Sequence, residues 1–140
     1  MDFGFNDTQE HIKETARGFL AERYPPAKVR ELAEAGTYDD SLWHEIVELG
    51  WPGIAISEDH GGQGLGMVEL VILCEELGYA CAPSPFLSNT AAGLTISVAG
   101  SDAQREARLP GIAAGNELGT VGLGASHRSG SEFPLVPDAA

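Results

Sequence analysis

Positively charged residues are scarce in this sequence. Eight lysines and arginines stand against 21 aspartates and glutamates, which leaves a formal net charge of −13, and none of the eight falls between Arg30 and Arg105. Nucleic acids and anionic membranes attract proteins through clustered lysines and arginines, so the composition argues against both as partners. We interpret the excess of acid as a generally acidic surface. The alternative is that basic groups come from a partner subunit or from chain outside this sequence.

Cysteines and long apolar runs are scarce as well. Cys74 and Cys81 fall seven residues apart on one predicted helix, which separates them by about 10 Å, too far for a disulfide. We therefore expect two free thiols in a reducing compartment, and no metal site, because no histidine or further cysteine lies at a ligand spacing. There is no run of about 18 apolar residues and no signal-peptide pattern, so the sequence predicts a cytoplasmic protein without a membrane span.

A glycine-rich stretch follows the apolar residues 54–56. Four glycines lie within six residues, at positions 61, 62, 64 and 66. Such a density favours positive φ angles and close backbone approach, as in a phosphate cradle or in a tight turn between packed helices. The spacing differs from the Gly-x-x-x-x-Gly-Lys-Ser/Thr phosphate loop, and no lysine or arginine follows. We therefore favour the structural turn.

Apolar residues recur at helical spacing in six segments of the 140-residue chain, which is long enough for one domain with a real core. The predicted helices are about 6–24, a short helix that ends at 36, then 39–50, 67–80, 86–99 and 101–115. Asn6 with Gln9, and Ser101 with Gln104, have the spacing of capping boxes. The fourth helix is apolar nearly all round, which predicts a central, buried element, with the residues Leu70, Val71, Leu73, Cys74 and Leu77.

The pattern changes after residue 117. Val121 and Leu123 are two residues apart in a glycine-interleaved segment, which predicts a strand over 118–124, and a second short strand is expected over 133–136. The predicted fold is therefore mainly α: a helical domain of about six helices over 1–116, followed by the first strands of an incomplete β domain over 117–140.

No set of residues predicts a self-contained active site. The four histidines have no serine, cysteine or carboxylate at a triad spacing. Glu75 and Glu76 are adjacent, so they point about 100° apart on a helix and cannot work as a face-sharing acid–base pair. We expect one of the two to accept hydrogen bonds from a nearby loop backbone.

Taken together, three segments resemble the acyl-CoA dehydrogenase family. They are residues 2–22, residues 42–87, which contain "EDHGGQGLGMVELVILCEELGYACAP", and residues 99–117. Each segment is moderately specific, while their order and spacing make the resemblance strong over roughly residues 2–118. The resemblance implies the N-terminal helical domain of the family and the start of its middle β domain.

The resemblance also implies a chemistry and a role for the fifth helix. Members of the family oxidise the Cα–Cβ bond of an acyl-CoA thioester: a glutamate removes the α-proton and FAD accepts the β-hydride. That glutamate lies in a C-terminal domain absent from this sequence, so no catalytic residue is assigned and the chain is not expected to be active alone. The fifth helix is expected to form a wall of the acyl pocket, with the candidates Phe86, Leu87, Asn89, Thr90 and Leu94. Packing of a core would give the same residues.

The flavin-contacting motif of the family is altered in this sequence. The family has a strand that ends in Leu-Thr-Glu-Pro, and Gly124 and Ala125 stand here in place of the Thr and the Glu. By the resemblance, backbone N–H groups of Leu123 and Gly124 are expected to contact the isoalloxazine ring. Ser131 belongs to a Gly-Ser-Glu echo of the turn that follows the motif.

Three functions fit this resemblance. The first is part of an FAD-dependent acyl-CoA dehydrogenase of fatty acid or sterol side-chain breakdown, with electron-transfer flavoprotein or a similar acceptor. The second is a non-catalytic subunit of a heteromeric acyl-CoA dehydrogenase, which the Gly124-Ala125 departure favours. The third is a flavin monooxygenase of the same fold. All three predict a homo- or hetero-oligomer, with a tetramer implied by the family.

Overall fold

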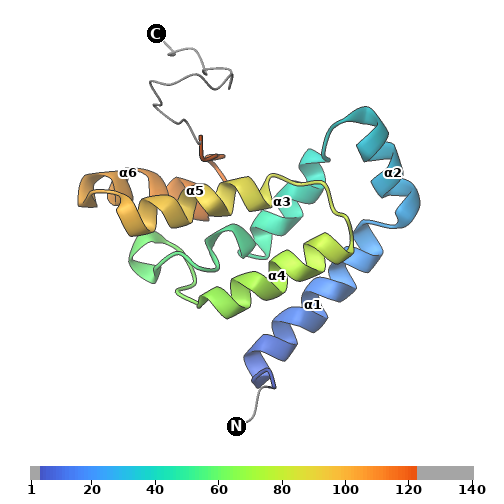
Figure 1. Cartoon of the computed structure of the whole chain (residues 1–140), viewed down its shortest axis with the longest axis horizontal. Helices are drawn as coiled ribbons and strands as arrows, with labels where there is room; N and C mark the ends of the chain where they lie inside the picture. Colours follow the sequence, from blue (N-terminus) through green and yellow to red (C-terminus); the bar gives the residue numbers. More distant parts are fainter. Residues whose placement is uncertain (1–3, 123–140) are drawn as a thin grey trace, which may run out of the picture.

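The computed structural model describes residues 4–122, and these form a helical domain (Figure 1). In chain order its α-helices are α1 (Asp7–Arg23), α2 (Pro26–Ala35), α3 (Asp40–Glu48), α4 (Met67–Tyr79), α5 (Phe86–Ala99) and α6 (Asp102–Ala113). Two short 3₁₀ turns, η1 (Trp51–Gly53) and η2 (Glu58–His60), lie between α3 and α4. The prediction of six helices is confirmed.

Capping signals in the sequence set several helix ends. The side chains and backbone N–H groups of Asn6 and Gln9 form both bonds of a capping box, and Ser101 and Gln104 do the same for α6. Gly36 adopts a φ of 64° directly after α2, which is the left-handed conformation that glycine accepts at low cost. Local sequence therefore determines where these helices begin and end.

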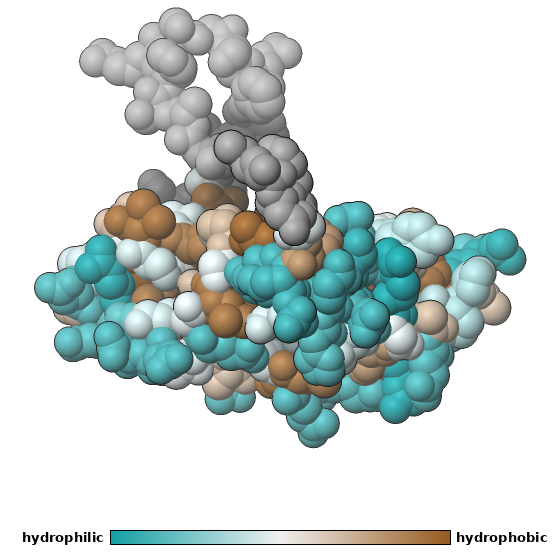
Figure 2. Space-filling view, turned by 90° about the horizontal axis from the view of Figure 1, so that it is seen from below, coloured by the Kyte–Doolittle hydropathy of each residue, from teal (hydrophilic) through white to brown (hydrophobic). Residues whose placement is uncertain are grey.

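The domain is built from two packed helix pairs: α1 packs along α4, and α5 packs along α6 (Figure 1). The short turn η1 contacts α3, α5 and α6. The main core cluster draws on α1 to α5 and includes Leu20, Ile46, Leu73 and Phe86, none of which is more than 1% exposed. A second cluster joins Ile56 to Leu109, Ile112 and Ala113. On the face seen in Figure 2, hydrophilic residues predominate and hydrophobic residues form separate patches among them.

The structure corrects the prediction that α4 is buried nearly all round. Leu70, Leu73 and Leu77 are buried, whereas Val71 is 57% exposed, and Met67 and Val68 are also exposed. Only one side of α4 faces α1 and the core. In residues 4–122 no helix is both long and apolar enough to cross a bilayer.

Two further predictions differ from the structure. Cys81 lies beyond the end of α4 with a φ of 49°, not on the same helix as Cys74, and both thiols are free. The strand predicted over 118–124 is not formed by residues 118–122, which have no partner strand within the described chain. Residues 123–140 lie outside the described residues. The predicted strand over 133–136 and the predicted β domain over 117–140 therefore stay predictions.

Candidate functional site

Helix α5 carries all five residues predicted to form the acyl wall, and it contains no charged residue. The structure places them on two faces. Phe86, Asn89 and Thr90 point into the domain and are buried, while Leu87 is 70% exposed. Leu94 is half-buried against the main core cluster. An exposed apolar face therefore lies on α5, and Val98 extends it.

Asn89 is a bridge between three parts of the chain. Its Nδ2 donates to the carbonyl oxygen of Ile112 at 3.3 Å, and its Oδ1 accepts from the backbone N–H of Gly119 at 2.9 Å. A Cβ atom at Gly119 would lie 2.5 Å from Cβ of Ala92, so only glycine permits this close approach. Asn89 thus fixes α6 and the segment after it against α5. Sequence spacing alone gave no sign of these bonds.

Thr90 differs from Asn89 because its hydroxyl is buried without a hydrogen-bond partner among residues 4–122. Leu123, Gly124 and Ser131, the predicted flavin contacts, lie outside the described residues. The described chain therefore contains the five residues predicted for the acyl wall. Their role stays a prediction, as do the predicted flavin contacts.

The glycine-rich loop is a structural turn, as predicted, and its backbone donors are already used. Gln63, Gly64 and Leu65 donate their N–H groups to the carbonyl oxygens of Gly53, Ile56 and Ile54, at 2.9, 2.8 and 2.9 Å. A Cβ atom at Gly62 would lie 2.1 Å from the carbonyl oxygen of Ile56. Since these N–H groups face the protein's own backbone, they cannot cradle a phosphate.

Two polar contacts join α1 to α4. Gln9 donates to Glu69 at 2.8 Å near the N-terminal ends of both helices. Farther along, the Arg17 guanidinium donates to both carboxylate oxygens of Glu76, at 2.8 and 2.9 Å. One of Glu75 and Glu76 was expected to accept hydrogen bonds from a nearby loop backbone. For Glu76 that prediction is wrong, because its partner is the side chain of Arg17, 59 residues away in the sequence.

The contacts between α1 and α4 shift the pKa values of Arg17 and Glu69, and burial shifts that of Cys74. The hydrogen bond to Glu76 raises the pKa of Arg17 further above its ordinary value. The hydrogen bond from Gln9 lowers the pKa of Glu69. Burial raises the pKa of Cys74, so its thiol is less reactive than a solvent-exposed one.

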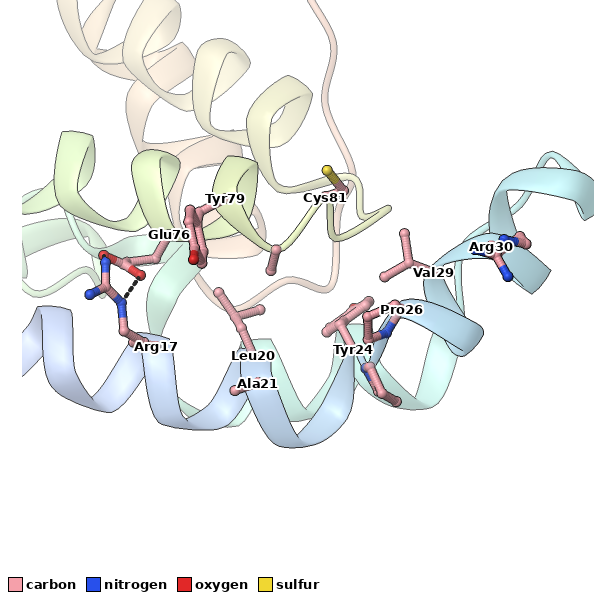
Figure 3. Close-up of a pocket in the computed structure, with 12 residues that line it drawn as sticks. Arg17, Leu20, Ala21, Tyr24, Pro26, Val29, Arg30, Glu76, Tyr79 and Cys81 are labelled. Carbon is pink, nitrogen blue, oxygen red and sulfur yellow. Dashed lines mark hydrogen bonds and ion pairs between the residues drawn. The ribbon is translucent and has the colours of Figure 1, made fainter.

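A groove opens where α1, α2 and α4 meet (Figure 3). Arg17 and Glu76 lie at one end of it, and Arg30 lies at the other, beyond Pro26 and Val29. Within the described range, no three histidines, cysteines or carboxylates lie close enough together to hold a metal ion. Neither the groove nor α5 contains a nucleophile aligned with a general base.

A family model described as "Acyl-CoA dehydrogenase, N-terminal domain" matches residues 6–116. The chain therefore belongs to the acyl-CoA dehydrogenase family. It is 34% identical over 120 residues to acyl-CoA dehydrogenase IpdE2 of Mycobacterium tuberculosis. The matched region covers 84% of this chain and 37% of that protein.

Solved structures share the fold of this chain. A chain in the structure of the electron transferring flavoprotein of Acidaminococcus fermentans superposes with a TM-score of 0.71 and 28% identity, over 84% of this chain and 32% of that one. A chain of the ChsE4–ChsE5 complex of Mycobacterium tuberculosis gives a TM-score of 0.60 and 31% identity, over 83% and 30%. The sequence thus spans about a third of the length of the relatives it matches.

Proposed function

We propose that this chain forms the N-terminal helical part of an FAD-dependent acyl-CoA dehydrogenase, with α5 as a wall of the acyl pocket. The observation that carries the proposal is the composition of α5. This helix has no charge along 14 residues, and yet Leu87 is 70% and Val98 is 81% exposed. Because a contiguous apolar face on a surface helix is normally covered, a ligand or another domain is expected on it.

The five candidate residues then have two roles. The exposed Leu87 and the half-buried Leu94 contact the hydrocarbon part of the acyl group. Phe86, Asn89 and Thr90, on the inner side, set the position of that wall. Asn89 does so through its two hydrogen bonds to Ile112 and Gly119.

FAD would supply the acceptor for the β-hydride when it is bound. The proposal gives the backbone N–H groups of Leu123 and Gly124, and Ser131, the role of flavin contacts. Residues 4–122 contain none of these, so no step of the reaction is assigned to them. The base that removes the α-proton comes from chain outside this sequence, and electron-transfer flavoprotein or a similar acceptor would reoxidise the flavin in an oligomer.

The test is the visible spectrum of the protein, purified as its full-length form or with its natural partner, before and after addition of acyl-CoA. We expect a flavin band that bleaches. Leu87→Trp should shift the preference toward shorter acyl chains, because the larger side chain fills the pocket. Val68→Trp on α4 is the matched control, since Val68 is an exposed apolar residue as well and lines a pocket to which α5 contributes no residue. A bleaching reaction whose chain-length preference is unchanged by Leu87→Trp would refute the assignment of α5.

A second candidate is a non-catalytic subunit of a heteromeric enzyme. Two observations favour it: the match to a chain of the ChsE4–ChsE5 complex, and the Gly124-Ala125 pair in place of the family's Thr and Glu. In that case the purified chain alone would carry no flavin, and flavin and acyl-CoA bleaching would appear only after a second, catalytically complete homologue is added.

A further inference from the structure

The groove between α1, α2 and α4 is separate from the proposed acyl wall. None of the residues that line it belongs to α5, and its volume is about 590 Å³, within the range of small-molecule sites. Its lining is mostly apolar and includes Leu20, Ala21, Tyr24, Pro26, Val29 and Tyr79. An apolar groove of this size can bury a hydrocarbon chain.

The charge of this groove is opposite to that of the protein. Two arginines and one glutamate line it, which leaves one net positive charge in a chain whose net charge is −13. Arg17 is held by Glu76, so the charge in excess is that of Arg30. Glu31 and Glu34, the acidic residues that follow Arg30 on α2, do not line the groove.

Arg30 is also distinct among the lysines and arginines of residues 4–122, because neither an ion pair nor an aromatic-ring contact engages it. The other lysines and arginines there have partners: Lys13 on the Phe5 ring, Arg17 with Glu76, Arg23 with Glu45, Lys28 with Asp39, Arg105 with Asp102 and Arg108 with Glu117. Its guanidinium is exposed at the end of the groove, beyond Val29 (Figure 3). It is therefore available to an anion that lies in the groove.

We propose that this groove binds an amphipathic carboxylate, with the hydrocarbon chain along Leu20, Tyr24 and Val29 and the carboxylate on Arg30. A guanidinium can bind a carboxylate through two parallel hydrogen bonds, and the apolar lining gains from removal of the chain from water. A single free charge at one end of an apolar groove matches a ligand with one anionic head and one tail. The acyl-CoA of the proposed function would lie elsewhere, on α5.

The test is calorimetric titration of the full chain with decanoate below its micelle concentration. We expect saturable binding, and weaker binding of decanol, which has the same chain without the carboxylate. Arg30→Gln should weaken decanoate binding about tenfold or more, because a charge-assisted hydrogen bond is lost. Arg108→Gln is the matched control: Arg108 is an exposed arginine outside the groove, and its substitution should leave the affinity unchanged.

A second variant and a second measurement make the result independent of the calorimetric signal. Ala21 is exposed and lines the groove, so Ala21→Glu adds a repelling charge without disturbing the core. This variant should also lose decanoate binding. Cys81 is exposed and lines the groove, so bound decanoate should slow alkylation of its thiol by iodoacetamide in the wild type and not in either groove variant.

Three results would overturn the proposal. They are no decanoate binding to the wild type, equal binding of decanoate and decanol, and equal binding to wild type and Arg30→Gln. If Arg30→Gln changes the oligomeric mass while decanoate neither binds nor protects Cys81, the groove is a protein interface and the proposal is wrong. None of these results depends on flavin bleaching by acyl-CoA, so the two proposals can fail separately.

Discussion

Arg17 on α1 and Glu76 on α4 form a two-point ion pair in which only one partner is buried. The guanidinium Nε and Nη2 donate to the two carboxylate oxygens at 2.9 and 2.8 Å. The side chain of Glu76 is 1% exposed, whereas that of Arg17 is 54% exposed and lies over the ring of Tyr79. The buried carboxylate of Glu76 thus depends for its charge partner on a guanidinium that remains in contact with water.

This asymmetry predicts the effect of removing the cation. Arg17→Ala leaves the Glu76 carboxylate buried without its partner, which is far more costly than the loss of a surface pair. We expect the midpoint of thermal unfolding to fall by several degrees, measured by circular dichroism. Arg108→Ala, which breaks the exposed pair with Glu117, should leave the midpoint nearly unchanged. The double variant Arg17→Ala/Glu76→Gln should recover part of the loss, and an Arg17→Ala variant that unfolds like the wild type would contradict this account.

Helix α4 provides a second prediction, because it has one buried and one exposed side. Leu70→Ala or Leu77→Ala should each lower the free energy of unfolding by about 2–5 kcal/mol, through lost burial and the cavity left behind. Val71→Ala should change it by less than about 0.5 kcal/mol, since Val71 is 57% exposed. Urea denaturation followed by circular dichroism measures all three. Equal effects at Leu70 and Val71 would show that α4 is placed wrongly.

Tyr24 is buried, and its hydroxyl has no hydrogen-bond partner in the described chain. Burial, with Asp39 and Glu45 nearby, raises the pKa of Tyr24 from 10.0 to about 12. The neutral phenol therefore contributes stability that is complete below pH 10 and is lost as the pH rises toward 12.

Tyr24→Phe removes both the unpaired hydroxyl and this titration. We expect the variant to be as stable as the wild type at pH 7, or more stable by about 1 kcal/mol. Its stability should fall less than that of the wild type between pH 10 and pH 12, as measured by urea denaturation at each pH. Parallel pH profiles for the two proteins would count against a role for Tyr24 in the alkaline loss.

Cys81 occupies a position that normally favours glycine. It has a φ of 49°, and the N–H groups of Cys81 and Ala82 donate to the carbonyl oxygens of Gly78 and Leu77, which is the hydrogen-bond pattern of a Schellman cap. Cys81→Gly should relieve the left-handed strain and stabilise the domain by about 0.5–1 kcal/mol. Cys81→Ala keeps the strain and is the control, so a gain in both variants would point to the thiol instead of the backbone.

Local signals in the sequence were sufficient for the helices and insufficient for their contacts. Asn6 and Ser101 start helices through bonds to residues three positions away, so their roles can be read directly. The pairing of Arg17 with Glu76, and the exposure of Val71, depend on which side of α4 meets α1. Periodicity could not decide that side, because α4 is apolar nearly all round.

At the candidate site, too, the sequence predicted the limits of the helix but not the contacts of its side chains. The sequence located the uncharged helix and its limits at Phe86 and Ala99. It did not separate Leu87, which faces outward, from Asn89, which holds Gly119 by a contact 30 residues distant in the sequence. Pro110 lies inside α6, where a proline usually ends or kinks a helix, and the helix nevertheless continues to Ala113.

The glycine-rich loop has a consequence for how the folded protein meets a protease. Exposed glycine-rich segments are common points of cleavage, because their backbone can extend into an active site. In this loop the N–H groups of Gln63, Gly64 and Leu65 are bound to carbonyl oxygens of residues 53–56, so the peptide bonds cannot be drawn out without breaking the turn. We therefore expect the segment that looks most open to digestion in the sequence to resist cleavage in the folded protein.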